Sequence, residues 1–222
     1  PAVIENWSGV TFERPLQRMR EVVDIIRLAL GGDRVDYSSD MFCLKDFRLG
    51  FRPARSDIPI FIASIGPKNN RLTGEIADGW LPIWLSPGGF SRALEEVGSV
   101  LEIAPNIMAC VGEDQQNLRN MVRPQLAYYV GGMGTFYKNV VARFGFQDEA
   151  ARIHELWSSG KRREAVTAVS DAMIDNLTAL GSPNACRKRI DEFREAGATL
   201  PVVVVPHSAT KEQIERTLRE LR

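Results

Sequence analysis

Gly66 and Pro67 are the residues whose types and position most directly indicate ligand chemistry. They end an almost wholly apolar run, Ile58 to Ile65, as expected of a parallel strand covered on both faces. A glycine lets the backbone approach a ligand or adopt positive φ, and the proline begins the next helix with its φ already set. Because ligands of α/β folds bind where parallel strands end, this turn is a candidate binding site.

A second apolar strand, Trp80 to Leu85, follows after a short helix over residues 68–77. This β-loop-α-β order predicts a right-handed crossover that brings the carboxyl ends of both strands to one face of a sheet. Asp78 and Glu75 precede the second strand. They lie at the wrong end for catalysis, and we expect them to pair with nearby Lys or Arg side chains.

Other residues with chemical potential fit structural roles better. His207 after the last strand is interpreted as a solvated loop residue, and His154, which has no H-E-x-x-H partner, as a helix-packing or surface residue. The glycine-rich run 131–134 lies between helices and favours a hinge over a phosphate cradle, and the basic run 161–163 favours a solvated helix end. Neither a G-x-G-x-x-G fingerprint after a strand nor a P-loop occurs.

The three cysteines, Cys43, Cys110 and Cys186, are far apart and form no C-x-x-C pair. This spacing argues against a disulfide framework and a zinc site, and we interpret all three as small buried hydrophobes.

Composition sets the remaining limits. The chain has 222 residues, 44% of them hydrophobic, and 28 basic side chains balance 28 acidic ones. No net field therefore favours nucleic acid or an anionic membrane surface as a partner. Neither a transmembrane run nor a signal peptide is visible, which predicts a cytoplasmic location.

Periodicity predicts four strands, each followed by a helix. The strands are 58–65, 80–85, 106–111 and 200–206, and we expect them to be parallel and adjacent in chain order. Between about Gln115 and Leu180 the pattern is wholly helical, with breaks at Pro124, the 131–134 run, Gly145 and Gly160. This insertion should cap the carboxyl ends of the strands. Further helices are expected over 15–30, from Phe90 to Leu101, from Ser182 to Gly197 and from Thr210 onward, with a loop or small hairpin over 33–57.

Four such units fit either an open doubly wound sheet or half of an eightfold barrel, and periodicity does not choose between them. The segments Pro15–Glu21, Ile62–Lys68, Gly74–Gly79 and Gly181–Val202 resemble those of the luciferase-like monooxygenase superfamily. Within it, they are most similar to the deazaflavin (F420)-dependent oxidoreductases related to methylenetetrahydromethanopterin reductase. The resemblance runs from about Ile4 to Pro206.

The resemblance implies an α/β fold of the (β/α)8 TIM-barrel type. The chain looks like the C-terminal half, about four β/α units over 1–222, with the helical insertion at about 115–180. A complete barrel needs about eight units. In the family, acid and base side chains come mostly from the N-terminal half, so the catalytic residues are unknown here.

The resemblance also implies the binding residues. Ser64, Ile65, Gly66 and Pro67 would lie beside a flavin-like ring or its phosphate tail, with the amides of the next helix toward a phosphate. Trp84, Leu85 and Ser86 would line the substrate side. An ordinary βα turn and ordinary packing are the alternatives. No metal is expected.

Two classes of function stay open. One is an oxidoreductase that transfers hydride between F420 and an organic small molecule, or uses reduced FMN with oxygen as a monooxygenase. The other is a non-catalytic half barrel that only binds or self-associates. Because four strands leave two open sheet edges, we expect a homo-oligomer.

Overall fold

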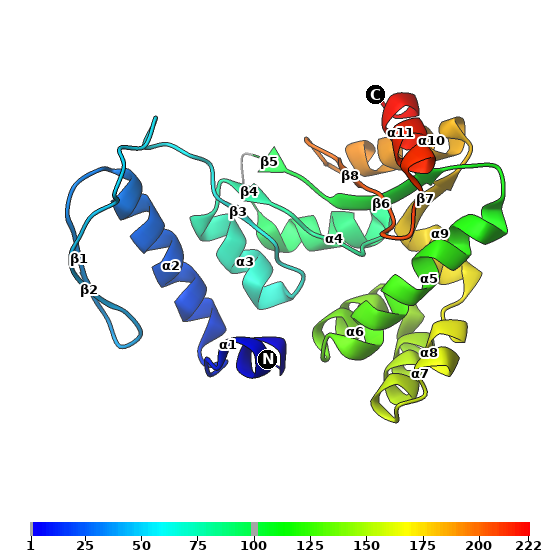
Figure 1. The fold of residues 1–222 in the computed structure, drawn as a ribbon, viewed down its shortest axis with the longest axis horizontal. Coiled ribbons are helices and arrows are strands. Elements are labelled where there is room, and N and C mark those ends of the chain that lie inside the picture. Colours follow the sequence, from blue (N-terminus) through cyan, green and yellow to red (C-terminus); the bar gives the residue numbers. More distant parts are fainter. Residues whose placement is uncertain (1, 99–101) are drawn as a thin grey trace.

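The computed structural model describes residues 2–98 and 102–222 (Figure 1). Its first part contains the short helix α1 (Ala2–Ser8), the long helix α2 (Pro15–Leu30) and an antiparallel hairpin of β1 (Val35–Ser38) and β2 (Cys43–Phe47). The predicted helix and the small hairpin are confirmed. Helix α1 was not predicted.

Helix α2 is attached to the sheet by two carboxylates. Arg27 donates a hydrogen bond to Asp78 at 2.9 Å, and Arg20 pairs with Glu75. Asp78 also accepts a 2.8 Å hydrogen bond from the backbone amide of Ile60. Burial alone would raise the pKa of Asp78, but the amide and Arg27 outweigh it and lower that pKa. The predicted structural roles of Asp78 and Glu75 are confirmed.

The predicted strands are parallel and follow chain order. They are β3 (Phe61–Ile62), β4 (Gly79–Trp80), β6 (Asn106–Val111) and β8 (Val202–Val204), and a further short strand, β5 (Glu102–Ile103), was not predicted. β3 pairs with β4, β4 with β5, and β6 with β8, all in parallel register. A parallel bridge from Ile83 to Asn106 continues the pairing from the β4 segment to β6.

Most of these strands are shorter than their apolar runs. Pro59, Pro82 and Pro201 each stand in or beside a predicted strand, and proline has no N–H to give to a ladder. The apolar composition of the run 200–206 is typical of a buried parallel strand, but all three residues of β8 are half-buried. Within the described residues β8 pairs only with β6, so its other edge is left uncovered.

Four helices follow the strands and cover the sheet: α3 (Pro67–Ile76), α4 (Pro87–Val97), α10 (Pro183–Glu195) and α11 (Lys211–Glu220). The apolar cluster beneath α4 and α10 includes Trp80, Phe90 and Phe193, whose rings pack at 5.4 and 5.7 Å. α4 ends at Val97 because Gly98 adopts a left-handed φ of 74°. Leu101, predicted on this helix, lies outside the described residues.

The insertion consists of α5 (Gln115–Gly132), α6 (Phe136–Val141), the π-helical turn η1 (Ala142–Phe146), α7 (Gln147–Ser158), α8 (Arg162–Thr167) and α9 (Asp171–Leu177). Two predictions about it were wrong. Pro124 lies inside α5 rather than breaking it. The last residues of the supposed helical region form β7 (Thr178–Gly181), which pairs in parallel with Met108–Val111 of β6. β7 is only four residues long and directly follows Leu177 of α9, so its apolar residues read as a continuation of the helical pattern.

The insertion packs against the carboxyl ends of the strands, as predicted. Tyr129 on α5 lies edge-on to Trp84, just after β4, with ring centroids 5.5 Å apart. Ser208, just after β8, donates a 3.5 Å hydrogen bond to the carbonyl oxygen of Met121 on α5. Val204 and Val205 pack on the same apolar cluster as α5. The insertion is therefore positioned to cover a site at this end of the sheet.

The cysteine prediction was correct for Cys110 and Cys186, which are buried, but wrong for Cys43, which is exposed on β2. The hairpin lies at the periphery of the molecule, where its strands leave side chains in solvent (Figure 1). None of the described helices is both long and apolar enough to cross a membrane.

Candidate functional site at the carboxyl ends of the strands

Gly66 leaves open space where β3 turns into α3. Its backbone is extended, with φ of −103° and ψ of 148°, so a positive φ is not the reason for a glycine here. A Cβ placed on Gly66 would meet nothing within 4 Å. The glycine therefore keeps the backbone accessible to a group that approaches this turn.

The first turn of α3 offers unpaired polar groups beside this space. No side chain caps the helix, and Pro67 at its first position has no N–H, which leaves the amides of Lys68 and Asn69 without a capping partner. The Oδ1 atoms of Asn69 and Asn70 are buried and accept no hydrogen bond from any described residue. Buried polar atoms are nearly always paired. Amide donors at a helix start suit a phosphate, and the two amide oxygens suit hydroxyl groups.

Ser64 and Ile65 support this turn from behind. The Ser64 hydroxyl is hydrogen-bonded to the Thr73 hydroxyl at 2.9 Å, and the Ser64 carbonyl oxygen accepts from the indole N–H of Trp80 at 2.9 Å. Ile65 packs on the apolar cluster around Trp80. The side chain of Ser64 is therefore used inside the fold, and only the backbone of Ile65 and Gly66 is left for a ligand.

The three residues predicted on the substrate side separate in the structure. Trp84 is 2% exposed and belongs to the apolar cluster of the insertion, whereas Leu85 belongs to the cluster under α4. Ser86 caps α4, since its hydroxyl accepts the amide of Gly89 at 3.1 Å. Trp84 is the one of the three that packs in the cluster built mainly from the insertion, while the cluster of Leu85 also includes Val140 and Phe144 of the insertion.

Trp84 is one end of a row of three aromatic rings. Its ring meets Tyr129 edge-on, and Tyr129 meets Tyr137 of α6 edge-on at 4.8 Å. Burial, together with the nearby Tyr129, raises the pKa of Tyr137 to about 12, so its hydroxyl stays protonated at neutral pH. We call Trp84, Tyr129 and Tyr137 the aromatic row. It forms an uncharged wall at the carboxyl end of β4.

A polar chain links the start of α3 to the insertion. The Asn70 amide donates to Glu96 on α4 at 2.9 Å, and Arg143 of η1 pairs with the same carboxylate. Burial alone would raise the pKa of Glu96, but the hydrogen bonds from Arg143 and Asn70 outweigh it and lower that pKa. Glu96 therefore holds η1 and the first turn of α3 in one arrangement.

Glu96→Gln should lower stability at neutral pH. The folded-state pKa of Glu96 is depressed, so the carboxylate contributes its stability above its ordinary pKa of 4.5 and loses it as the pH falls further. The stability difference between wild type and variant should be largest at pH 6 to 7 and shrink below pH 4.5. Urea unfolding across this range measures it, with the exposed Glu95→Gln as control. A difference independent of pH would contradict this role.

The remaining candidates keep structural roles. His207 is exposed, as predicted, and Arg162 lies over the ring of Trp157 at 5.6 Å. The glycine run is not a loop: Gly131 and Gly132 lie inside α5 against Trp157, and the chain turns only at Gly134, with φ of 75°. The described residues contain no cluster of His, Cys, Asp or Glu that could hold a metal ion.

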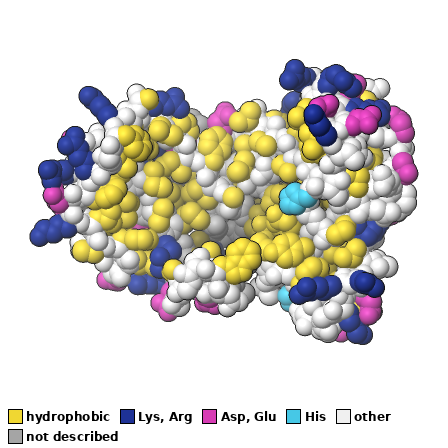
Figure 2. All heavy atoms as spheres, in the orientation of Figure 1, with side chains coloured by type: hydrophobic (Ala, Val, Ile, Leu, Met, Phe, Trp, Pro, Cys, Tyr) yellow, Lys and Arg dark blue, Asp and Glu magenta, His cyan; other side chains and the backbone are white. Residues whose placement is uncertain are grey.

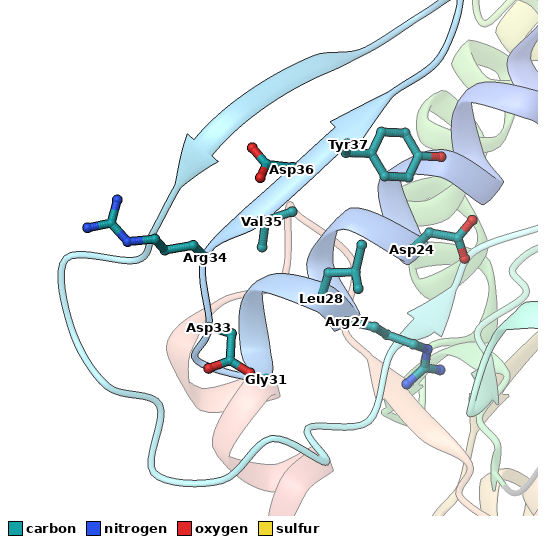
Figure 3. A pocket seen from close by; sticks show the side chains of 9 residues that line it. All are labelled: Asp24, Arg27, Leu28, Gly31, Asp33, Arg34, Val35, Asp36 and Tyr37. Carbon is teal, nitrogen blue, oxygen red and sulfur yellow. The ribbon is translucent and has the colours of Figure 1, made fainter.

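A second concave surface lies away from the strand ends, between α2 and the hairpin (Figure 3). It is an open groove lined by Leu28, Val35 and several charged side chains, among them Asp24 and Arg34. Arg27, which also lines it, is already paired with Asp78. The groove contains no unpaired buried polar atom, and we do not regard it as the binding site.

The model of the family described as luciferase-like monooxygenase matches residues 1–200. The chain belongs to the luciferase-like monooxygenase family. A Mycobacterium tuberculosis protein whose name places it among the coenzyme F420-dependent oxidoreductases is 31% identical, over 91% of this chain and 67% of its own length.

Two further proteins are similar to this chain. The 5,10-methylenetetrahydromethanopterin reductase of Archaeoglobus fulgidus is 31% identical, over 92% of this chain and 65% of its own length. The solved structure of the coenzyme F420-dependent tetrahydromethanopterin reductase of Methanopyrus kandleri superposes with a TM-score of 0.72. It is 24% identical and covers 94% of this chain and 64% of its own chain, a likeness of fold. This chain of the luciferase-like family therefore spans about two thirds of the length of these relatives.

Sequence reasoning missed Asn69, Asn70 and Tyr129 as site residues. The two asparagines directly follow the Gly-Pro turn, and an amide pair at a helix start was a usable signal. The sequence does not indicate what the helix carrying Tyr129 packs against, and only the fold brings Tyr129 to Trp84.

Proposed function

We propose that this chain is the C-terminal portion of a (β/α)8 barrel that binds F420 and an organic substrate for hydride transfer. The observation that supports this best is the turn at Gly66, where open space, uncapped amides and unpaired buried oxygens of α3 occur together. The name of the 31% identical Mycobacterium tuberculosis relative supports F420 as the cofactor. The chain over 1–222 would form one barrel domain with the insertion at about 115–180 as a lid.

The residues present fit such a cofactor. The backbone of Ile65 and Gly66 would lie against its ring or tail, and the amides of Lys68 and Asn69 would bind its phosphate. When bound, F420 supplies the hydride chemistry. Trp84 would flank the substrate, and the insertion would exclude water from it. We assign no catalytic acid or base.

The alternatives are an FMN-dependent monooxygenase and a non-catalytic half barrel. Titrating the chain with F420 and with FMN, followed by fluorescence, separates them, and a turnover assay tests catalysis. We expect F420 to bind more tightly than FMN. Tighter binding of FMN would favour the monooxygenase. Turnover is assayed with the complete barrel, because the acid and base side chains are expected mostly outside this chain, and F420 binding without turnover there would favour the non-catalytic form. Absence of binding to both cofactors would contradict the proposal.

We also expect the chain to self-associate. Among the described residues, β3 pairs only with β4 and β8 only with β6, so both present an open edge. Exposed large hydrophobics are frequent in the first quarter of the chain, and hydrophobic side chains are widespread on the face shown in Figure 2. They include Ile4, Trp7, Val10, Val22, Ile26, Leu28, Phe47, Phe51 and Ile58. Sedimentation at low micromolar concentration measures the state, and a sharply melting monomer would contradict this expectation.

A further inference from the structure

Two buried side-chain polar atoms, one on Trp84 and one on α5, have no partner among the described residues. The indole N–H of Trp84 and the Oε1 of Gln125 are both shielded from solvent, and neither has a hydrogen bond within the described part of the chain. Only 2% of the surface of Trp84 is exposed to solvent. One atom is a donor and the other an acceptor. An unpaired group of this kind is costly, which calls for an explanation in each case.

The backbone of Trp84 adds an independent sign of function. Its φ is 58°, in the left-handed region that a bulky side chain rarely adopts. Such conformations persist where the surrounding structure imposes them, and they are concentrated at ligand sites. At this position the turn directs the indole toward α5, where it packs on Tyr129.

Gln125 lies on the same side of α5 as the residues that face the strand ends. Met121, Gln125 and Tyr129 are spaced four residues apart and so share one face of the helix. Met121 is held by the segment after β8, through Ser208 and Gln213. Tyr129 packs on Trp84 after β4. Gln125 therefore lies between these two contacts, over the carboxyl ends of the strands.

We propose that Trp84 and Gln125 form a recognition site for an amide or lactam edge of an uncharged substrate. The substrate carbonyl accepts from the Trp84 indole, and the adjacent substrate N–H donates to the Gln125 oxygen. Trp84 lies in a cluster of buried apolar side chains, where an uncharged ligand costs less to desolvate than a charged one. Both protein atoms are already shielded from water, so hydrogen bonds to a ligand meet little competition from solvent. This inference rests on the proposed function, since it specifies the substrate of the same site.

Two lactams test the proposal directly. The ring 2-piperidone carries both the carbonyl and the N–H, and N-methyl-2-piperidone carries only the carbonyl. Each is titrated into the chain labelled with 15N-tryptophan, and the indole resonances are followed by NMR. The Trp84 signal is assigned by its absence in Trp84→Phe. We expect it to shift, with 2-piperidone binding about tenfold more tightly, the discrimination typical of one hydrogen bond in a desolvated site.

Variants separate the two contacts. Gln125→Met should abolish the difference between the lactams, and Trp84→Phe should weaken both while keeping the aromatic packing. Trp157→Phe changes a different tryptophan, which lies in the insertion, and should alter the affinity for neither lactam. Equal affinities in the wild type, a preference that persists in Gln125→Met, or no lactam binding would each overturn the proposal.

An F420 titration of the same sample keeps the two proposals apart. F420 binding without lactam binding would remove the recognition site and leave the proposed function standing. Lactam binding without F420 binding would contradict the proposed cofactor and leave the recognition site standing.

Discussion

Gly74→Ala should destabilise the chain strongly, by about 2 kcal/mol or more, as overpacking in a tight core does. Gly74 lies where α3 crosses α4, and a Cβ there would be 1.7 Å from the backbone carbonyl oxygen of Val97. A backbone atom cannot move aside as a side chain can, so the two helices must separate. Thermal or urea unfolding measures the loss.

Gly88→Ala is the matched control for this change. Gly88 lies in the first turn of α4, where a Cβ meets nothing within 4 Å, and its φ is not positive. Alanine is the better helix former, by up to about 1 kcal/mol, so this variant should be as stable as wild type or slightly more stable. Equal stability of the Gly74 and Gly88 variants would contradict the close crossing of α3 and α4.

Gly66→Val should lower F420 affinity at least tenfold while the fold is retained. The extended backbone at Gly66 suits a branched residue, and the added side chain enters open space rather than protein. The cost to folding should stay within about 1 kcal/mol, the scale of helix-start substitutions. The same space is where the proposed cofactor would lie, so the valine would obstruct it.

The control is Gly50→Val, in a loop where a Cβ also meets nothing. Fluorescence titration with F420 should show wild-type affinity for this variant. If Gly66→Val bound F420 as tightly as the wild type, the segment would be a simple turn between β3 and α3.

Local patterns predicted the order of the fold well and its strand lengths poorly. The Gly66-Pro67 turn, the helix that starts at Thr210 and the parallel order of the strands rest on short-range chemistry, and all are present. The ends of β3 and β8 depend on pairing with distant segments, which no local run of apolar residues reveals. Strand β7 forms only because β6 is there to pair with it.

The candidate site was predictable in part for the same reason. The sequence indicated the turn at Gly66 and placed Trp84 at the end of a predicted strand. It did not indicate that Ser64 is used by Thr73 and Trp80, or that Ser86 caps a helix, since both depend on where neighbouring side chains point. Gln125 and Tyr129 enter the site through the packing of α5, which begins far along the chain from β3.

The central claim is that F420 binds where β3 ends, and amide NMR of the 15N-labelled chain during an F420 titration tests it most directly. The account predicts the largest shifts at the amides of Gly66, Lys68 and Asn69, with smaller changes at Trp84. Shifts confined to the groove between α2 and the hairpin, at Asp24, Val35 and Tyr37, or no shifts at all, would contradict it.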